Sequence, residues 1–134
     1  MAAWQAPTGN PWFEVPRDAA IARLGRPPPV DPRAPSPTAF ADQDYVVGIL
    51  RDAGWAQSAC EHRTVELHHP GPAEDMARLA SSIGPAARVI RHFSGTSADQ
   101  EAITEAVAEG FQQFQSGGET RIPAELNFLS AIAP

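Results

Sequence analysis

One short stretch carries the side chains best suited to chemistry, Asn10-Pro11-Trp12-Phe13. Its proline restricts the backbone, and the stretch combines one amide with two aromatic rings. Aromatic walls with a few placed polar groups are typical of small-molecule pockets. The same residues also fit a simpler structural role, in which a buried Trp-Phe pair anchors a loop. The sequence leaves both interpretations open.

A second group of reactive side chains lies between Cys60 and His69. Cys60 and His62 are two residues apart on a predicted strand, so they share a face and could form a thiolate–imidazole pair. His62, Glu66 and His68 alternate in the same way and could ligate a metal. At about 3.3 Å per residue, however, His62 and His68 are roughly 20 Å apart. We therefore predict neither a metal site nor a catalytic residue here, and interpret the stretch as a polar edge strand.

Composition narrows the classes of function. At 134 residues the chain is expected to form one domain, residues 1–134. The net charge is −6 and the ten basic residues, all arginine, are thinly spread, which argues against a nucleic-acid partner. Cys60 is the single cysteine, which excludes an internal disulfide framework and makes a cytoplasmic location the expectation. No apolar run approaches the roughly 20 residues of a membrane helix, so no membrane partner is predicted.

Several signatures of catalysis are absent from the sequence. No two glycines are spaced as G-x-G, which excludes the dinucleotide fingerprint, and there is no P-loop and no G-x-S-x-G elbow. No pair of carboxylates stands out as a general acid and base. The sequence therefore names no catalytic residue and no cofactor-binding residue.

Periodicity and breaker residues predict the order strand, helix, proline-rich loop, helix, strand, three helices, strand. The range 26–37 holds six prolines in twelve positions and is predicted to be an extended loop. Asp42 is expected to cap the second helix, and Thr96 or Ser97 the longest one. The predicted strands are Ala2–Ala6, Trp55–His68 and Leu126–Ile132; the predicted helices are Arg17–Leu24, 43–53, Ala73–Ile83, Ala86–Phe93 and 97–115.

The last predicted strand is apolar on both faces. Leu126, Phe128 and Ile132 fall on one face, and Leu129 and Ala131 on the other. This pattern is typical of an α/β sheet with helices above and below. We therefore expect these side chains to be buried and the strand to have neighbours on both edges.

Four stretches, in order, carry a resemblance to a known family. They are Trp4 with Asn10–Phe13; Leu24–Pro29 with Asp31–Pro37; Phe40-Ala41-Asp42 with Ile49-Leu50 and Ala53-Gly54-Trp55; and Ile83–Arg88, followed by a long helix and a final strand. Together they resemble the C-terminal half of class I S-adenosylmethionine-dependent methyltransferases of the ubiquinone/menaquinone-methyltransferase-like group. Asn10-Pro11-Trp12 is also similar to the Asn/Asp-Pro-Pro-aromatic tetrapeptide of amino-methyltransferases, with one proline missing.

The resemblance implies an α/β fold that is part of a Rossmann-like methyltransferase sheet. It implies the last two to three strands with covering helices, the final strand being antiparallel and inserted between those at Ala2–Ala6 and Trp55–His68. It also implies a small-molecule methyl acceptor bound near Asn10, Trp12, Phe13 and Phe40. The family's glycine-rich turn and acidic cofactor residue have no counterpart here. We therefore expect that these residues alone do not bind S-adenosylmethionine, and that a complementing N-terminal half is needed.

Two other classes of function remain open. One is a non-catalytic small α/β protein that forms a homodimer, or docks to a partner, through its sheet edge. The other is a remnant without activity.

Overall fold

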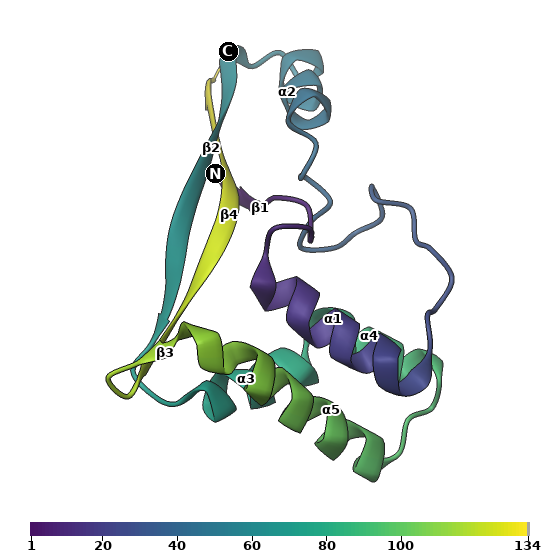
Figure 1. Cartoon of the computed structure of the whole chain (residues 1–134). Helices are drawn as coiled ribbons and strands as arrows, with labels where there is room; N and C mark the ends of the chain where they lie inside the picture. The colour runs from purple at the N-terminus through teal and green to yellow at the C-terminus, as the bar shows by residue number, and fades with distance from the viewer. Residues whose placement is uncertain (134) are drawn as a thin grey trace. The chain divides into compact units, whose positions relative to one another are not determined.

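A computed structural model describes residues 1–133, which form five helices and four strands (Figure 1). They divide into two compact units. The sheet unit comprises Met1–Asn10, Val30–Val65 and the chain from Ala124 onward, and the helical unit comprises Pro11–Pro29 and Glu66–Pro123. The predicted α/β class is therefore confirmed.

In the sheet unit, the last strand lies between the first two. Strand β4 (Glu119–Ile132) has β1 (Ala2–Trp4) on one side and β2 (Ala56–His69) on the other. The β1–β4 pairing is antiparallel, with Ala2 opposite Phe128 and Trp4 opposite Leu126. The predicted position of the antiparallel last strand, between the first and second strands of the chain, is confirmed.

One helix belongs to the sheet unit, α2 (Gln43–Asp52). Asp42 caps it as predicted, because its side chain accepts a 3.1 Å hydrogen bond from the backbone N–H of Tyr45. Val46 is the buried residue of this helix. The proline-rich range 26–37 that precedes it forms neither helix nor strand, in agreement with the prediction.

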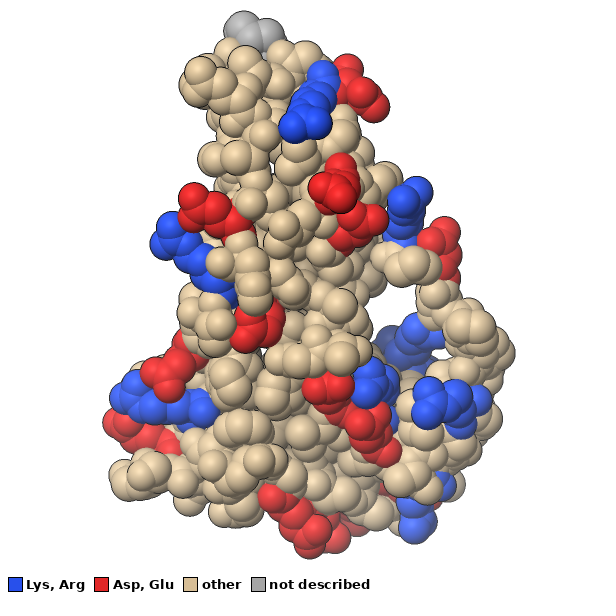
Figure 2. All heavy atoms as spheres, turned by 45° about the horizontal axis from the view of Figure 1, so that its top comes forward, with Lys and Arg blue, Asp and Glu red and all other residues tan. Residues whose placement is uncertain are grey.

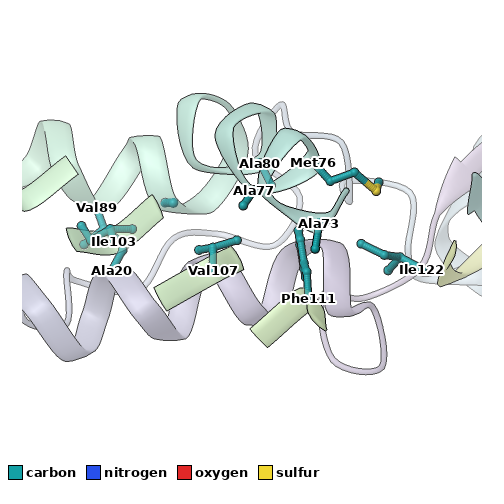
Figure 3. Close-up of a cluster of buried hydrophobic side chains, with 11 residues drawn as sticks. Ala20, Ala73, Met76, Ala77, Ala80, Val89, Ile103, Val107, Phe111 and Ile122 are labelled. Atoms are coloured by element: carbon teal, nitrogen blue, oxygen red, sulfur yellow. The ribbon is translucent and has the colours of Figure 1, made fainter. Parts of the chain in front are cut away.

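The helical unit contains α1 (Pro11–Leu24), α3 (Ala73–Ser82), α4 (Gly84–His92) and α5 (Ser97–Phe111), followed by a 3₁₀ turn (Gln112–Phe114) and the short strand β3 (Gln115–Ser116). Helix α5 begins with the predicted cap, in which Thr96 and Asp99 exchange hydrogen bonds as a capping box. The unit has one apolar core, shown in Figure 3. Its buried members are Ala20, Ala73, Met76, Ala77, Ala80, Ala86, Val89, Ile103, Val107, Phe111 and Ile122.

Helix α5 ends at Phe111, before the predicted residue 115, and two elements begin well before their predicted starts. Helix α1 begins at Pro11 and not at Arg17, so Pro16 lies inside it. Pro11 suits the first helical position, where a missing N–H breaks no helical hydrogen bond. Pro16 lacks the N–H for one backbone hydrogen bond of the helix, and its side chain is buried. Strand β4 begins at Glu119, because β3 pairs antiparallel with its start through Gln115 and Thr120.

The expectation that the last strand is buried on both faces was also wrong in part. Leu129 is buried, but Phe128 is 38% exposed and Ile132 is 54% exposed. Within the sheet unit, α2 and the segment before it contact the face of β4 that carries Asn127. The opposite face, with Phe128 and Ile132, receives no helix from the described residues of this unit.

Candidate functional site

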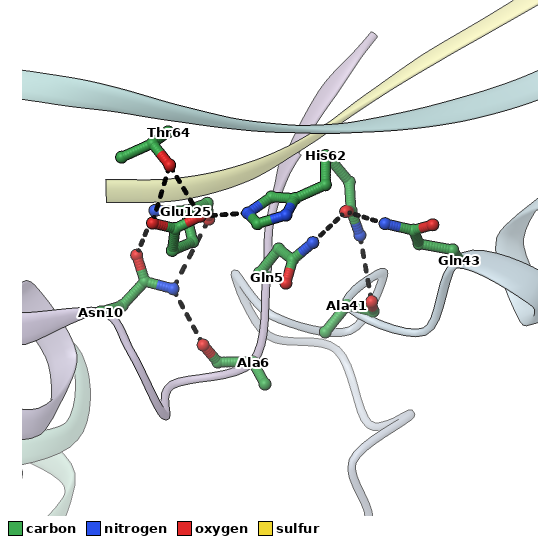
Figure 4. A network of polar contacts seen from close by, with 9 residues as sticks. Gln5, Ala6, Asn10, Ala41, Gln43, His62, Thr64 and Glu125 are labelled. Atoms are coloured by element: carbon green, nitrogen blue, oxygen red, sulfur yellow. Dashed lines mark hydrogen bonds and ion pairs between the residues drawn. The ribbon is translucent and has the colours of Figure 1, made fainter. Parts of the chain in front are cut away.

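A polar cluster lies on one face of the sheet unit, where β1 ends (Figure 4). Asn10 is fully buried, and its side chain is held by backbone groups. Its Oδ1 accepts a 2.7 Å hydrogen bond from the N–H of Glu125, and its Nδ2 donates to the carbonyl of Ala6 at 2.9 Å. Gln5 N–H donates to the carbonyl of Glu125 at 3.0 Å. The backbone pairing with β4 that begins in β1 extends to Gln5. The side chain of Asn10 then takes the place of a backbone group in the next hydrogen bond, with the N–H of Glu125.

Asn127 is the second buried amide of this cluster, and it makes four hydrogen bonds. Its Oδ1 accepts from Gln5 Nε2 at 2.7 Å and from Gln43 Nε2 at 3.0 Å. Its Nδ2 donates to the carbonyls of Phe40 and Ala41, at 3.2 and 3.0 Å. The donors and acceptors of the amide are thus fully used, and they join β4 to the residue after β1, to α2 and to the segment before α2.

The titratable part of the cluster is formed by His62 and Glu125, which come from neighbouring strands. The Glu125 carboxylate accepts hydrogen bonds from His62 Nε2 and from the Thr64 hydroxyl, the latter at 3.0 and 3.2 Å. The hydrogen bond from His62, followed by that from Thr64, lowers the pKa of Glu125. The His62 side chain is 48% exposed. A carboxylate that orients an accessible imidazole is an arrangement able to take up a proton from a bound acceptor.

A cavity of about 400 Å³ adjoins this cluster within the sheet unit. It is lined by Ala6, Pro32, Arg33, Thr38, Ala39, Ala41 and Asp42. Ala6 and Ala41 belong to both features, because their carbonyls accept the hydrogen bonds of Asn10 and Asn127. The cavity volume falls within the range of small-molecule sites. The carboxyl end of β1 therefore combines a cavity, a buried polar network and a carboxylate–imidazole pair.

The four predicted substrate-binding residues are divided between the two units. Asn10 and Phe40 belong to the sheet unit, where Asn10 is fully engaged and Phe40 is 37% exposed. Trp12 and Phe13 lie in the first turn of α1 in the helical unit. Trp12 stacks on Phe111, with ring centroids 6.3 Å apart, and Phe13 is buried. Their role as substrate-binding residues stays a prediction.

The other reactive side chains of β2 pair with neighbours. In the helical unit, His68 lies 3.2 Å from Glu119, and Glu66 lies 3.7 Å from Arg121. Burial raises the pKa of Cys60, which disfavours its thiolate. Within residues 1–133 no group of three His, Cys, Asp or Glu side chains is placed to hold a metal ion.

The helical unit has an open groove of about 520 Å³. Its lining residues are Glu74, Arg78, Ser97, Gln100, Glu101, Thr104, Glu105 and Ala108. Its charged lining residues are thus mainly acidic, with Arg78 as the one cation among them. In Figure 2, acidic and basic side chains are interspersed over the face shown, without a basic stripe.

Sequence reasoning missed Gln5, Glu125 and Asn127. The available signal was Asn127, an amide in the predicted strand Leu126–Ile132, whose other residues are apolar except Ser130. A polar residue at such a position is expected to have buried hydrogen-bond partners. Its partners come from two distant segments, Gln5 and residues 40–43, and no local pattern identifies them.

Comparison with protein-family models finds no match for this chain, and comparison with curated proteins finds none either. None of the helices in the described part of the chain has the length and apolar character needed to cross a membrane.

Proposed function

We propose that these 134 residues form the substrate-side portion of a class I S-adenosylmethionine-dependent methyltransferase that acts on a small molecule in the cytoplasm. One observation carries the proposal, the strand order β1-β4-β2 with the last strand antiparallel to β1. The sequence resemblance implies this order, in which the final strand enters between two strands that precede it in the chain. A simple meander of three strands would have placed β2 in the middle.

The exposed face of β4 supports the same proposal. Phe128 and Ile132 are large apolar side chains, and strands that are apolar on both faces belong to sheets covered on both sides. In the proposed enzyme, the S-adenosylmethionine-binding half covers this face. The chain alone then lacks both the cover and the cofactor site.

The polar cluster supplies the chemistry of the proposal. Ligands of α/β sheets bind beyond the carboxyl ends of the strands, and the cavity lies there relative to β1. Methyl transfer needs chiefly the alignment of the acceptor atom with the sulfonium methyl. His62, oriented by Glu125, is the imidazole of the adjoining polar cluster that would receive the proton released by a hydroxyl or amine acceptor, although it is not among the residues that line the cavity.

Reconstitution tests the proposal. The 134-residue chain is mixed with the separately expressed cofactor-binding half of a methyltransferase of the resembled group, and S-adenosylmethionine binding is followed by calorimetry. We expect the two parts to co-purify and the mixture to bind the cofactor. The 134-residue chain alone, which lacks the glycine-rich turn, should show no micromolar binding. Micromolar binding by the 134-residue chain alone, or no association in the mixture, would contradict the proposal.

Matched variants locate the interface in that experiment. Phe128→Ser and Ile132→Ser change exposed side chains, so the chain should stay folded while its association with the complementing half is lost. Leu79→Ser is the control, because Leu79 is 53% exposed but belongs to the helical unit. Equal association of all three variants would exclude the proposed role of this face.

A second candidate, dimerisation through the sheet edge, is favoured by the position of β2. This strand ends the order β1-β4-β2 and is 14 residues long, so it offers an edge that could pair with a second copy. Size-exclusion chromatography with light scattering tests it, and a stable monomer at all concentrations would argue against it.

A further inference from the structure

Arg33 is held in a defined position at the wall of the sheet-unit cavity. Its guanidinium carbon lies 4.2 Å from the centroid of the Tyr45 ring, a cation–π arrangement. Its backbone N–H donates to Asp31 Oδ1 at 2.9 Å, and Ala34 N–H donates to the carbonyl of Asp31 at 3.0 Å. The turn and the aromatic ring therefore restrain both ends of the residue.

The donors of this guanidinium have no hydrogen-bond acceptor within residues 1–133. The nearest carboxylate oxygen is Asp42 Oδ2, 4.0 Å away, and the other oxygen of Asp42 already accepts from Tyr45 N–H. By contrast, Arg23 in the helical unit donates to Asp99 at 2.8 Å. Arg33 thus presents a planar, charged fork whose one ion-pair partner among the described residues is Asp42 at 4.0 Å, and both residues line the cavity of about 400 Å³.

We propose that this cavity binds a small organic acid whose carboxylate pairs with Arg33. A guanidinium fork matches a carboxylate with two parallel hydrogen bonds. The Thr38 hydroxyl lines the same cavity and offers a further donor, while Ala6, Pro32 and Ala39 provide apolar contacts for the body of the ligand. The assignment of this acid as the methyl acceptor rests on the proposed function; its binding does not.

Benzoate is a suitable probe, and benzamide is its neutral counterpart of the same shape. Each is titrated into the 134-residue chain, labelled with nitrogen-15, and the amide and arginine side-chain signals are followed by NMR. We expect benzoate to shift the signals of Arg33, Ala39 and Ala41 with saturation in the millimolar range. Benzamide should bind roughly tenfold more weakly or worse, because it cannot form the charge-assisted pair.

Three variants identify the contact. Arg33→Gln should weaken benzoate binding roughly tenfold or more, and Arg33→Lys should restore it only in part, because lysine keeps the charge but not the fork. Arg51→Gln is the control, because this substitution removes the same charge. Arg51 is exposed in the last turn of α2 and does not line the cavity. Circular dichroism and the dispersion of the spectra verify that each variant is folded.

The outcomes are distinct from those of the reconstitution experiment, because no cofactor or second chain is present. The inference would be overturned if benzoate caused no signal shifts at concentrations up to roughly 50 mM, which is about the weakest affinity expected for so small a ligand. Equal binding of benzoate and benzamide, or equal loss in Arg33→Gln and Arg51→Gln, would overturn it too. In each of these cases the proposed methyltransferase role would stand or fall on its own test.

Discussion

The side chain of Asn10 pairs with the backbone of Glu125, a residue 115 positions away in the chain, through a 2.7 Å hydrogen bond from the N–H of Glu125 to Asn10 Oδ1. The Nδ2 of the same amide donates to the carbonyl of Ala6 at 2.9 Å. Because Asn10 is fully buried, water cannot replace these hydrogen bonds. The amide thus fastens the end of β1 to the middle of β4, beside the candidate site.

We first predict that Asn10→Ala destabilises the protein by roughly 1–3 kcal/mol, because it removes a fully buried amide and the hydrogen bonds that this amide makes with the backbone of Ala6 and Glu125. Asn10→Asp should also destabilise it, since a carboxylate would face the carbonyl of Ala6 in place of a donor. Urea unfolding measures both effects. Gln113→Ala, which removes one hydrogen bond at an exposed position, is the control and should change stability by less than about 1 kcal/mol.

A second prediction concerns Asn127. Asn127→Leu should cost roughly 1–3 kcal/mol, because it removes a fully buried amide together with its hydrogen bonds to the carbonyls of Phe40 and Ala41. Gln43→Ala removes a single partner of Asn127 and should cost less. The double variant should cost clearly less than the two single changes combined, since the residues share one hydrogen bond. Full additivity in urea unfolding would contradict the network.

Third, Glu125→Gln should change how stability depends on pH. The pKa of Glu125 is lowered in the folded protein from the ordinary value of 4.5, chiefly by the hydrogen bond from His62. Its contribution is therefore present above about pH 4.5 and is lost as the pH falls through the lower, folded-state value. The Tm of Glu125→Gln should lie below that of the wild type at pH 6, and the two should converge in strong acid.

Glu105→Gln serves as the control for that series, because Glu105 is exposed on α5 and makes no ion pair or hydrogen bond within the described chain. Its difference in Tm from the wild type should stay nearly constant over the same pH range. A constant difference for Glu125→Gln as well would show that the contact with His62 contributes nothing to stability.

The fourth prediction compares two helical glycines. A Cβ at Gly110 would lie 2.6 Å from Val15 Cγ1, whereas a Cβ at Gly48 would meet no atom within 4 Å. Gly48→Ala should therefore stabilise the protein by about 0.5–1 kcal/mol through helix propensity. Gly110→Ala should destabilise it by roughly 1–2 kcal/mol, because overpacking against a stiff β-branched residue outweighs that gain. Thermal unfolding distinguishes the signs, and stabilisation by both changes would refute the close contact of α1 with α5.

Local signals in the sequence were sufficient for the class of fold and for most elements. Apolar spacing predicted α3, α4 and α5 within a few residues, and side-chain chemistry predicted the caps Asp42 and Thr96. These features depend on residues three or four positions apart, so a window of sequence contains their physical cause. The start of α1 was missed because Pro11 was interpreted as a breaker and Pro16 as part of the first turn, whereas Pro11 is the first helical residue and Pro16 is tolerated inside the helix.

The candidate site depended on tertiary structure. The sequence by itself determined that the chain is α/β, that its last strand is strongly apolar, and that Asn10, Trp12, Phe13 and Phe40 are the distinctive side chains near its start. Only the fold decided that the side chain of Asn10 binds the backbone of Glu125, and that His62 pairs with the Glu125 carboxylate, 63 residues away. The physical reason is that pairing β4 between β1 and β2 brings remote polar groups together on one face, where the buried amides Asn10 and Asn127 must each find hydrogen-bond partners.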